Sequence, residues 1–278
     1  MTGTGMDVRA TTRITELFSR LKREGRKGFI AYITAGDPSP DRTAQLVEAL
    51  ERGGADLIEL GVPFSDPIAD GPVIQRAGYR ALEAGTTVPK VLEIAAEIRA
   101  RSEIPLLLFT YLNPVMRYGF EKLSRDAKAA GIDGCLLTDA SVEEAGAYVQ
   151  VMRSAGLDTV FLAAPTSTAR RLQLVAEYST GFVYLVSRAG VTGERDSISS
   201  TVAPLIRSMR AITDLPLAVG FGVSTPEHVA EIGSQAEAVV VGSAIMRVIE
   251  QNAGNASLEI QLESFVRELK RGFNMVRA

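Results

Sequence analysis

The sequence is poor in the residues that hold metals and disulfides. Its 278 residues include one histidine, His228, one cysteine, Cys135, and no tryptophan. A single cysteine excludes an internal disulfide framework and fits a protein of a reducing compartment. One histidine and one cysteine make a zinc finger or a histidine-rich metal centre implausible, and we expect no metal site. If the chain is an enzyme, carboxylates, hydroxyls and backbone amides must carry its chemistry.

Strong charge and long apolar runs are missing as well. The formal net charge is −3, which gives no electrostatic reason to expect nucleic-acid binding, since that relies on clustered Lys and Arg. No stretch reaches the ~18 continuous apolar residues that a membrane span needs. The start of the chain, Met1–Met6, lacks the charged and apolar regions of a secretory signal. We expect residues 1–10 to form a flexible N-terminus. Together these features predict a cytoplasmic protein.

Short apolar runs alternate along the chain with longer amphipathic segments. The runs are bounded by glycine and lack strict polar alternation, which is typical of strands buried on both faces of a parallel sheet. We predict eight strands, at Gly28–Ile33, Asp56–Leu60, Pro105–Tyr111, Gly134–Thr138, Thr159–Ala163, Phe182–Val186, Leu217–Gly220 and Ala238–Val241. We predict helices at Thr12–Lys22, Asp41–Arg52, Pro72–Ala84, Val88–Arg101, Phe120–Ala130, Val142–Ala155, Thr168–Tyr178, Ser199–Thr213, Pro226–Gly233 and Leu258–Phe273.

Eight strands that alternate with helices in a chain of this size favour an α/β fold, the (β/α)8 barrel of typically ~250 residues. We expect one barrel domain over residues 11–278, with Thr12–Lys22 as an extra N-terminal helix. An open doubly wound sheet is the competing fold, but no glycine-rich fingerprint follows the first strand. In a barrel the functional groups lie at the C-terminal ends of the strands and in the loops after them.

Two carboxylates, Glu59 and Asp70, stand in the second predicted strand and in the loop after it. If Ile58 faces the outer helices, the two-residue period of a strand turns Glu59 inward. Desolvation would then raise the Glu59 pKa toward the range in which a carboxyl group both gives and takes a proton. Asp70 precedes a helix that starts at Pro72, whose dipole should keep this carboxylate ionised. The pair is typical of an acid/base site; the alternatives are a satisfied core glutamate and a plain helix cap.

Three glycine motifs follow the sixth, seventh and eighth predicted strands, at 188–193, 220–224 and 242–245. Glycine lets backbone N–H groups approach an anion, and a short helix starting near Ser243 would add its positive end. Barrels often bind phosphate in the loops after strands seven and eight, although glycine also makes ordinary turns. We predict a phosphate site held mostly by backbone amides, because few Lys or Arg residues lie nearby.

Aromatic residues are few, at 6% of the chain, yet several fall at strand ends. Tyr111 and Tyr184 are the best candidates for the wall of a flat apolar pocket, because a buried phenol needs a hydrogen-bond partner. Phe182 is expected to fill the core instead. The other aromatic residues that could line such a pocket are Tyr32, Phe109 and Phe221.

The stretch ELGVPFSDPIADGPVIQ at 59–75 is the most specific motif of the chain, and Gly36-Asp37-Pro38 and the three glycine motifs accompany it. In these motifs the chain resembles the tryptophan synthase alpha chains, from about Ile14 to the C-terminal helix. The resemblance implies a lyase of tryptophan biosynthesis that reversibly cleaves indole-3-glycerol phosphate to indole and D-glyceraldehyde 3-phosphate by a retro-aldol reaction. It implies Glu59 as the acid/base and Asp70 as the carboxylate that binds the indole N–H.

The resemblance also implies binding residues and a partner. Thr192 matches a mobile loop that closes over the site, and Tyr111 and Tyr184 match pocket positions. The implied phosphate-binding residues are Gly193, Gly222, Gly242 and Ser243. The implied partner is a beta chain that carries pyridoxal phosphate, joined in an α2β2 assembly and faced by Pro63 to Pro67 and the segment around Tyr111–Tyr118. No cofactor is implied for this chain itself.

Three departures from the family pattern concern the pocket and its surroundings. Tyr32 replaces a usual Phe, Phe109 replaces a smaller aliphatic residue, and Ala140-Ser141 replaces an apolar residue followed by Pro. The alternative functions are a stand-alone indole-3-glycerol phosphate lyase, a non-catalytic regulatory partner of the beta chain, and another phosphosugar enzyme built on a barrel. The motif from Glu59 to Asp70 argues against the last of these, because such relatives place their acid/base residues elsewhere.

Overall fold

A single closed sheet of parallel strands forms the centre of the molecule. The computed structural model describes residues 11–186, 198–220 and 222–275; the predicted flexible N-terminus lies outside them. The strands are β1 (Gly28–Thr34), β2 (Leu57–Gly61), β3 (Leu106–Thr110), β4 (Gly134–Leu137), β5 (Asp158–Val160), β6 (Leu162–Ala163), β7 (Val183–Val186), β8 (Leu217–Gly220) and β9 (Ala238–Val241).

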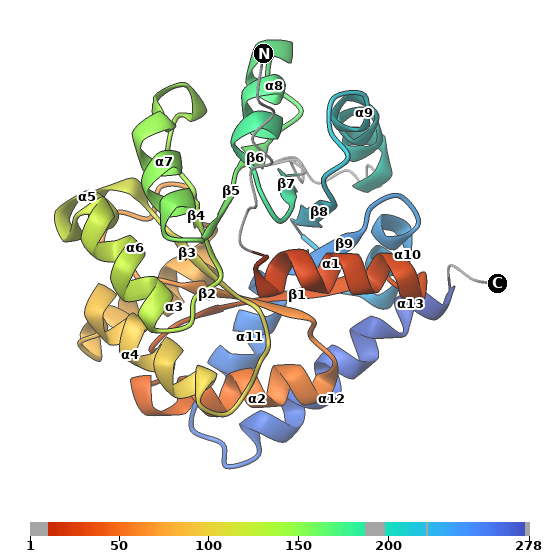
Figure 1. The fold of residues 1–278 in the computed structure, drawn as a ribbon. Coiled ribbons are helices and arrows are strands. Elements are labelled where there is room, and N and C mark those ends of the chain that lie inside the picture. Colours follow the sequence, from red (N-terminus) through yellow and green to blue (C-terminus); the bar gives the residue numbers. More distant parts are fainter. Residues whose placement is uncertain (1–10, 187–197, 221, 276–278) are drawn as a thin grey trace.

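The strand order is β5-β4-β3-β2-β1-β9-β8-β7-β6, and every pair is parallel. Only Phe161 separates β5 from β6, so the two ends of this order are halves of one interrupted strand. The sheet therefore closes on itself, with helices around it (Figure 1). This arrangement confirms the (β/α)8 barrel, and the open doubly wound sheet is wrong.

The predicted helices form, with small differences at their ends. The helices of the described residues are α1 (Arg13–Glu24), α2 (Thr43–Gly53), α3 (Pro72–Glu83), α4 (Val88–Arg99), α5 (Leu112–Tyr118), α6 (Phe120–Ala129), α7 (Gly146–Ser154), α8 (Ala169–Tyr178), α9 (Ile198–Arg210), α10 (Pro226–Gly233), α11 (Ser243–Asn252), α12 (Leu258–Lys270) and α13 (Gly272–Met275). Two predicted helices begin as 3-10 turns, η1 (Pro40–Arg42) and η2 (Val142–Glu144). Helix α5 was not predicted, because seven residues with Pro114 among them show no helical repeat. No helix in the described ranges is long and apolar enough to cross a membrane.

Alternate residues of each strand face two different cores. In β2, Leu57 belongs to the cluster inside the barrel, whereas Ile58 and Leu60 pack in the cluster between the sheet and the outer helices. This confirms the alternation expected for β2 and places Glu59 on the inner side. Phe182 is fully buried in the inner cluster, in agreement with its predicted role in the core.

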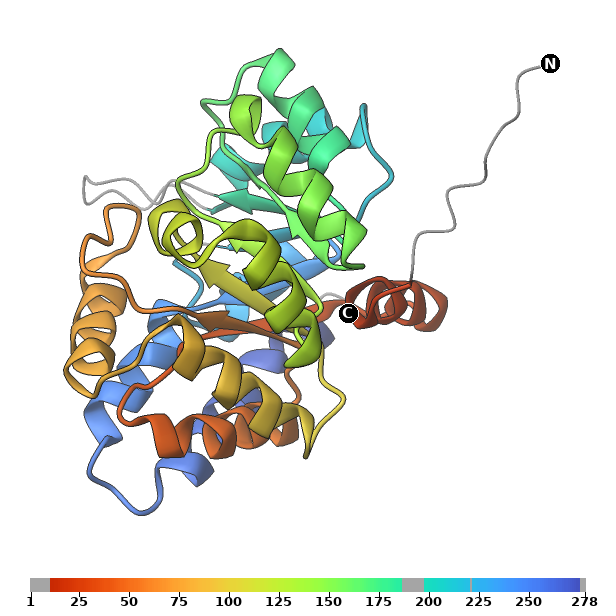
Figure 2. The ribbon, with the colours of Figure 1, turned by 60° about the vertical axis from the view of Figure 1, so that its left-hand side comes forward.

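Helix α1 closes the N-terminal end of the barrel. Its apolar face joins the inner cluster through Ile14, Leu17, Phe18 and Leu21, and the Phe18 and Phe182 rings lie 5.5 Å apart. Figure 2 shows α1 at one end of the barrel and α3 toward the other. The expected extra helix is thus a plug that leaves the C-terminal end of the barrel free for a site.

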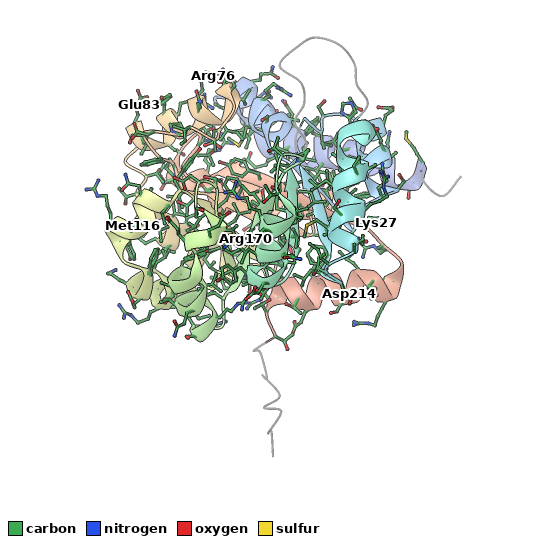
Figure 3. The ribbon with its side chains drawn as sticks, turned by 90° about the horizontal axis from the view of Figure 1, so that it is seen from above. Lys27, Arg76, Glu83, Met116, Arg170 and Asp214 are labelled. Carbon is green, nitrogen blue, oxygen red and sulfur yellow. The ribbon has the colours of Figure 1, made fainter. Side chains whose placement is uncertain are left out.

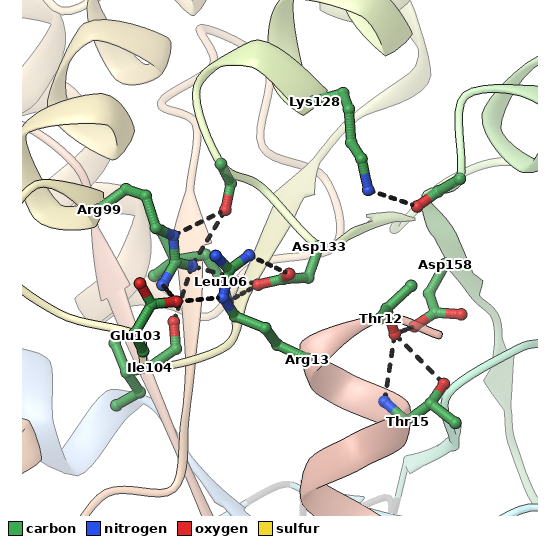
Figure 4. A network of polar contacts seen from close by, with 12 residues as sticks. Thr12, Arg13, Thr15, Arg99, Glu103, Ile104, Leu106, Lys128, Asp133 and Asp158 are labelled. Atoms are coloured by element: carbon green, nitrogen blue, oxygen red, sulfur yellow. Dashed lines mark hydrogen bonds and ion pairs between the residues drawn. The ribbon is translucent and has the colours of Figure 1, made fainter. Parts of the chain in front are cut away.

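A polar network fixes the start of α1 to the barrel (Figure 4). The Thr12 hydroxyl accepts a hydrogen bond from the Thr15 N–H at 3.1 Å and donates one to the Asp158 carboxylate. Arg13 reaches Asp133 at 3.1 Å, and Arg99 holds the other oxygen of the same carboxylate at 3.2 Å. Because these partners come from widely separated elements, the network sets the position of α1 beneath the strands.

Candidate active site

Glu59 lies inside the barrel on β2, opposite Tyr32 of β1 and Leu107 of β3. Its side chain is buried, with 1% exposure, and among the described residues its Oε1 atom has no hydrogen-bond partner. Burial raises the pKa of Glu59 from 4.5 to about 8, because the charged form is poorly solvated there. At neutral pH this carboxyl group is therefore mostly protonated. A core glutamate satisfied by its surroundings, the alternative for this residue, does not fit these observations.

Asp70 ends the loop that follows β2, directly before the N-cap Gly71 and the first helical residue Pro72 of α3. The Tyr111 hydroxyl donates a hydrogen bond to the Asp70 carboxylate and accepts one from the Ala69 N–H at 3.1 Å. Within the described part of the chain, no side chain caps the start of α3. Asp70 is consequently held by the tyrosine, and the plain capping role is not what the structure shows.

The pKa of Asp70 depends strongly on its burial. Burial raises it from 3.8 to about 6, and the hydrogen bond from Tyr111 lowers it only in part. Loss of water around the carboxylate sets the direction of this shift, whereas the sequence indicates only the dipole of α3, which favours the ionised form. At pH 7 Asp70 is still ionised in a ratio of about ten to one, so the two carboxyl groups hold different charges.

Glu59 and Asp70 line the same cavity, of about 160 Å³. An engineered apolar cavity of roughly 150 Å³ accepts a benzene ring, so this one has the size for a flat aromatic group. Its apolar and aromatic wall is made of Tyr32, Ile74, Phe109, Leu162, Tyr184, Val186 and Val240. A protonated and an ionised carboxyl group thus face an aromatic-sized space, which suits proton transfer to and from a planar ring.

The two cavity tyrosines fit because glycine stands beside each of them. A Cβ atom at Gly61 would overlap the Tyr32 hydroxyl, and one at Gly220 would overlap the Tyr184 hydroxyl. The Tyr32 hydroxyl also hydrogen-bonds Thr34 Oγ1 at 3.2 Å, and its ring meets Phe109 edge-on at 5.1 Å. The departure at Tyr32 therefore adds a hydroxyl that the strand ends accommodate.

The predicted binding residues are brought together in part. Gly222, Gly242 and Ser243 line the cavity, and α11 starts at Ser243 with ten residues, longer than the short helix expected there. Tyr184 also lines it, whereas Tyr111 lies behind the wall as the support of Asp70. Thr192, Gly193 and Phe221 lie outside the described residues. Among those that are described, no group of three or more His, Cys, Asp or Glu side chains could hold a metal ion.

One cavity residue was missed from the sequence. Arg247 of α11 lines the cavity, although few cations were expected near the phosphate motifs. It follows Ser243 by four residues, which places both on one face of a helix. That spacing could have revealed Arg247 if the full length of α11 had been predicted.

Comparison with known proteins identifies the family. The family model for the tryptophan synthase alpha chain matches residues 18–274. The tryptophan synthase alpha chain of Solibacter usitatus (strain Ellin6076) is 77% identical over 262 residues, which are 94% of this chain and 98% of that one. The chain belongs to the tryptophan synthase alpha chain family. The alpha chain of Geobacter sp. (strain M21) is 45% identical over 94% of this chain and 97% of its own length.

Solved structures agree with this membership of the tryptophan synthase alpha chain family. The alpha subunit from Legionella pneumophila superposes with a TM-score of 0.86 at 34% identity, covering 96% of this chain and all of that one. A chain of the α2β2 complex from Pyrococcus furiosus gives 0.82 at 42% identity, over 88% of this chain and 98% of its own. The protein is accordingly a lyase that cleaves indole-3-glycerol phosphate in tryptophan biosynthesis. Alpha chains need no cofactor, and the pyridoxal phosphate sits in the beta subunit.

Proposed function

We propose that Glu59 and Asp70 together perform the retro-aldol cleavage of indole-3-glycerol phosphate. The observation that carries the proposal is the buried Glu59 carboxyl group, which faces a cavity of aromatic size and has one oxygen without a hydrogen-bond partner in the described ranges. A group that is protonated at neutral pH and lacks a partner in the described protein is ready to give its proton to a bound substrate.

In the proposed first step, Glu59 donates its proton to C3 of the indole ring. The ring nitrogen then carries positive charge, and the ionised Asp70 faces the indole N–H and stabilises that charge. In the second step, the Glu59 carboxylate takes the proton of the adjacent glycerol hydroxyl. That hydroxyl becomes the aldehyde of glyceraldehyde 3-phosphate as the carbon–carbon bond breaks, and the bonding electrons restore the indole ring. Glu59 ends the reaction protonated, as it began.

The phosphate lies, in this proposal, at the positive end of α11. Gly242 and Ser243 are at that helix start, and Gly222, whose φ of 74° suits glycine, lies in the loop after β8. Backbone N–H groups at a helix N-terminus bind phosphate oxygens well. Thr192 and Gly193 remain predictions for loop closure and phosphate binding.

Indole release tests the proposal directly. The wild-type chain should release indole from indole-3-glycerol phosphate, and Glu59→Gln should abolish the release while still binding the substrate. Glu93→Gln is a matched control, because this side chain is 68% exposed on α4. Near-normal cleavage by Glu59→Gln would remove Glu59 from the mechanism. A folded wild-type chain that binds substrate but releases no indole, with or without a beta chain, would support the regulatory alternative.

We further propose a beta chain as the partner, in an α2β2 assembly. Two apolar side chains are strongly exposed at the C-terminal end of the barrel, Ile68 at 83% in the loop before α3 and Met116 at 62% on α5. The family resemblance assigns Pro63 to Pro67 and Tyr111–Tyr118 to the partner face; Ile68 directly follows the first segment, and Met116 lies within the second. The hydrogen bond between Tyr111 and the Ala69 N–H joins these two segments beside Asp70. A partner seated there would press on the loop that carries a catalytic group.

Adding a purified beta chain to the indole-release assay tests this part. A higher rate and co-elution of the two chains are expected, and Ile68→Asp should reduce both. An unchanged rate without co-elution would favour the stand-alone lyase.

A cytoplasmic location and a single domain over residues 11–278 belong to the same proposal. The single, buried Cys135 supports the location, and the closed sheet supports the single domain.

A further inference from the structure

Arg247 differs from the other residues around the cavity in its charge. It is the one cation among the described residues that line the cavity, whose only other charged groups are the carboxyls of Glu59 and Asp70. Its side chain is exposed at the cavity, and within the described part of the chain it makes no hydrogen bond or ion pair. An arginine in this situation has all its donors available to a ligand.

The neighbouring charges explain why Arg247 has no ion-pair partner among the described residues. Glu250, three residues further along α11, could reach it along the helix, but Arg76 and Arg80 of α3 each hold Glu250 at 2.8 Å. Arg80 also binds the buried Asp37 at 2.8 Å. Figure 3 shows Arg76 at the end of the molecule opposite α1. Glu250, the acidic residue nearest to Arg247 in sequence, is thus already paired with two arginines of α3 that do not line the cavity.

A phosphate ester brings up to two negative charges into a cavity that already holds one ionised carboxylate. The start of α11 offers roughly half a positive charge. Most of the negative charge of the phosphate would therefore remain unbalanced. Arg247 stands one turn after Ser243, on the same side of the helix. Its guanidinium can bind two phosphate oxygens at once.

We propose that Arg247 binds the phosphate group of the substrate and so makes the site specific for phosphorylated substrates. This role rests on the proposed function, and it adds a side-chain ligand to a site otherwise built from backbone amides. Arg247 is a specificity residue in this proposal, because the reacting atoms lie at the other end of the substrate.

The synthesis direction separates binding of phosphate from chemistry. Indole is combined with D-glyceraldehyde 3-phosphate or with unphosphorylated D-glyceraldehyde, using the wild type, Arg247→Gln, Arg247→Lys and the control Arg20→Gln. Arg20 is an exposed arginine on α1, at the closed end of the barrel. Loss of one charge-assisted contact should raise KM for the phosphorylated aldehyde about tenfold and leave kcat within about twofold.

Three further results complete the expected pattern. With D-glyceraldehyde, kcat/KM of Arg247→Gln should equal that of the wild type. Arg247→Lys should recover part of the affinity for the phosphorylated aldehyde, because lysine keeps the positive charge as a point charge. Arg20→Gln should behave as wild type with both aldehydes. An unchanged KM for the phosphorylated aldehyde in Arg247→Gln would overturn the proposal. An equal loss of kcat/KM with both aldehydes would also overturn the proposal, because Arg247 would then act on the fold and not on the phosphate.

Calorimetry with sn-glycerol 3-phosphate measures the same contact without turnover. Arg247→Gln should bind this phosphate ester about tenfold more weakly than the wild type, and equal affinity would contradict the proposal. If the wild type bound the ester through Arg247 but released no indole, the proposed catalysis would fail and the role of Arg247 would stand.

Discussion

Replacing Glu59 with glutamine should stabilise the folded chain as the pH rises, although it removes a catalytic group. The pKa of Glu59 is raised from 4.5 to about 8 because the folded protein desolvates its charged form. The folded state therefore binds this proton more tightly than the unfolded state does. Its contribution to stability is complete below pH 4.5 and is lost progressively as the pH rises toward 8.

The magnitude follows from that change in proton affinity. Each tenfold change is worth about 1.4 kcal/mol, so retaining Glu59 costs the folded state about 3 kcal/mol at pH 7 and about 1 kcal/mol at pH 5. The amide of the variant does not ionise, so it avoids this cost, but its unpaired polar groups cost roughly 1–2 kcal/mol at every pH. The net gain at pH 7 should therefore be about 1–2 kcal/mol.

Urea unfolding at pH 5, 7 and 8 measures this effect on the free energy of unfolding. The difference between Glu59→Gln and wild type should grow by about 3 kcal/mol from pH 5 to pH 8. The exposed control Glu93→Gln should stay within about 0.5 kcal/mol of wild type. A difference that is constant over this pH range would refute the reasoning, because the burial of Glu59 would then not change its proton affinity.

Two further predictions concern the pH profile and the packing of the site. Because Glu59 must be protonated and Asp70 ionised, kcat/KM for indole release should fall below about pH 6 and above about pH 8. Tyr111→Phe should move the acidic limb of this profile to higher pH, because it removes the hydrogen bond that lowers the pKa of Asp70. An acidic limb that does not move in this variant would contradict the role of Tyr111. Gly61→Ala should destabilise the chain by about 1–3 kcal/mol through overlap with the Tyr32 hydroxyl. Thermal unfolding measures that cost, and Tyr32→Phe in the same chain should recover part of it; no recovery would place the strain elsewhere.

Much of the site could be predicted from short-range patterns. The alternation of β2 places Glu59 inside because a strand has a period of two, and this holds whatever the neighbouring strands are. The glycine motifs after the late strands predicted where Gly222, Gly242 and Ser243 meet. The barrel itself follows from eight apolar runs separated by amphipathic helices.

The tertiary structure decided what depends on surroundings that are distant in sequence. The pKa of Asp70 rises because burial removes water from its carboxylate, a loss that the local helix dipole cannot reveal. Tyr111 supports the loop of Asp70 through a contact between two loops. Among the described residues Arg247 has no ion-pair partner, because Arg76 and Arg80 already bind Glu250. The sequence by itself determined that Glu59 lies on the strand face opposite Ile58, because a strand has a period of two. Only the fold determined the solvation and the partners of the site residues, since those are properties of the assembled barrel.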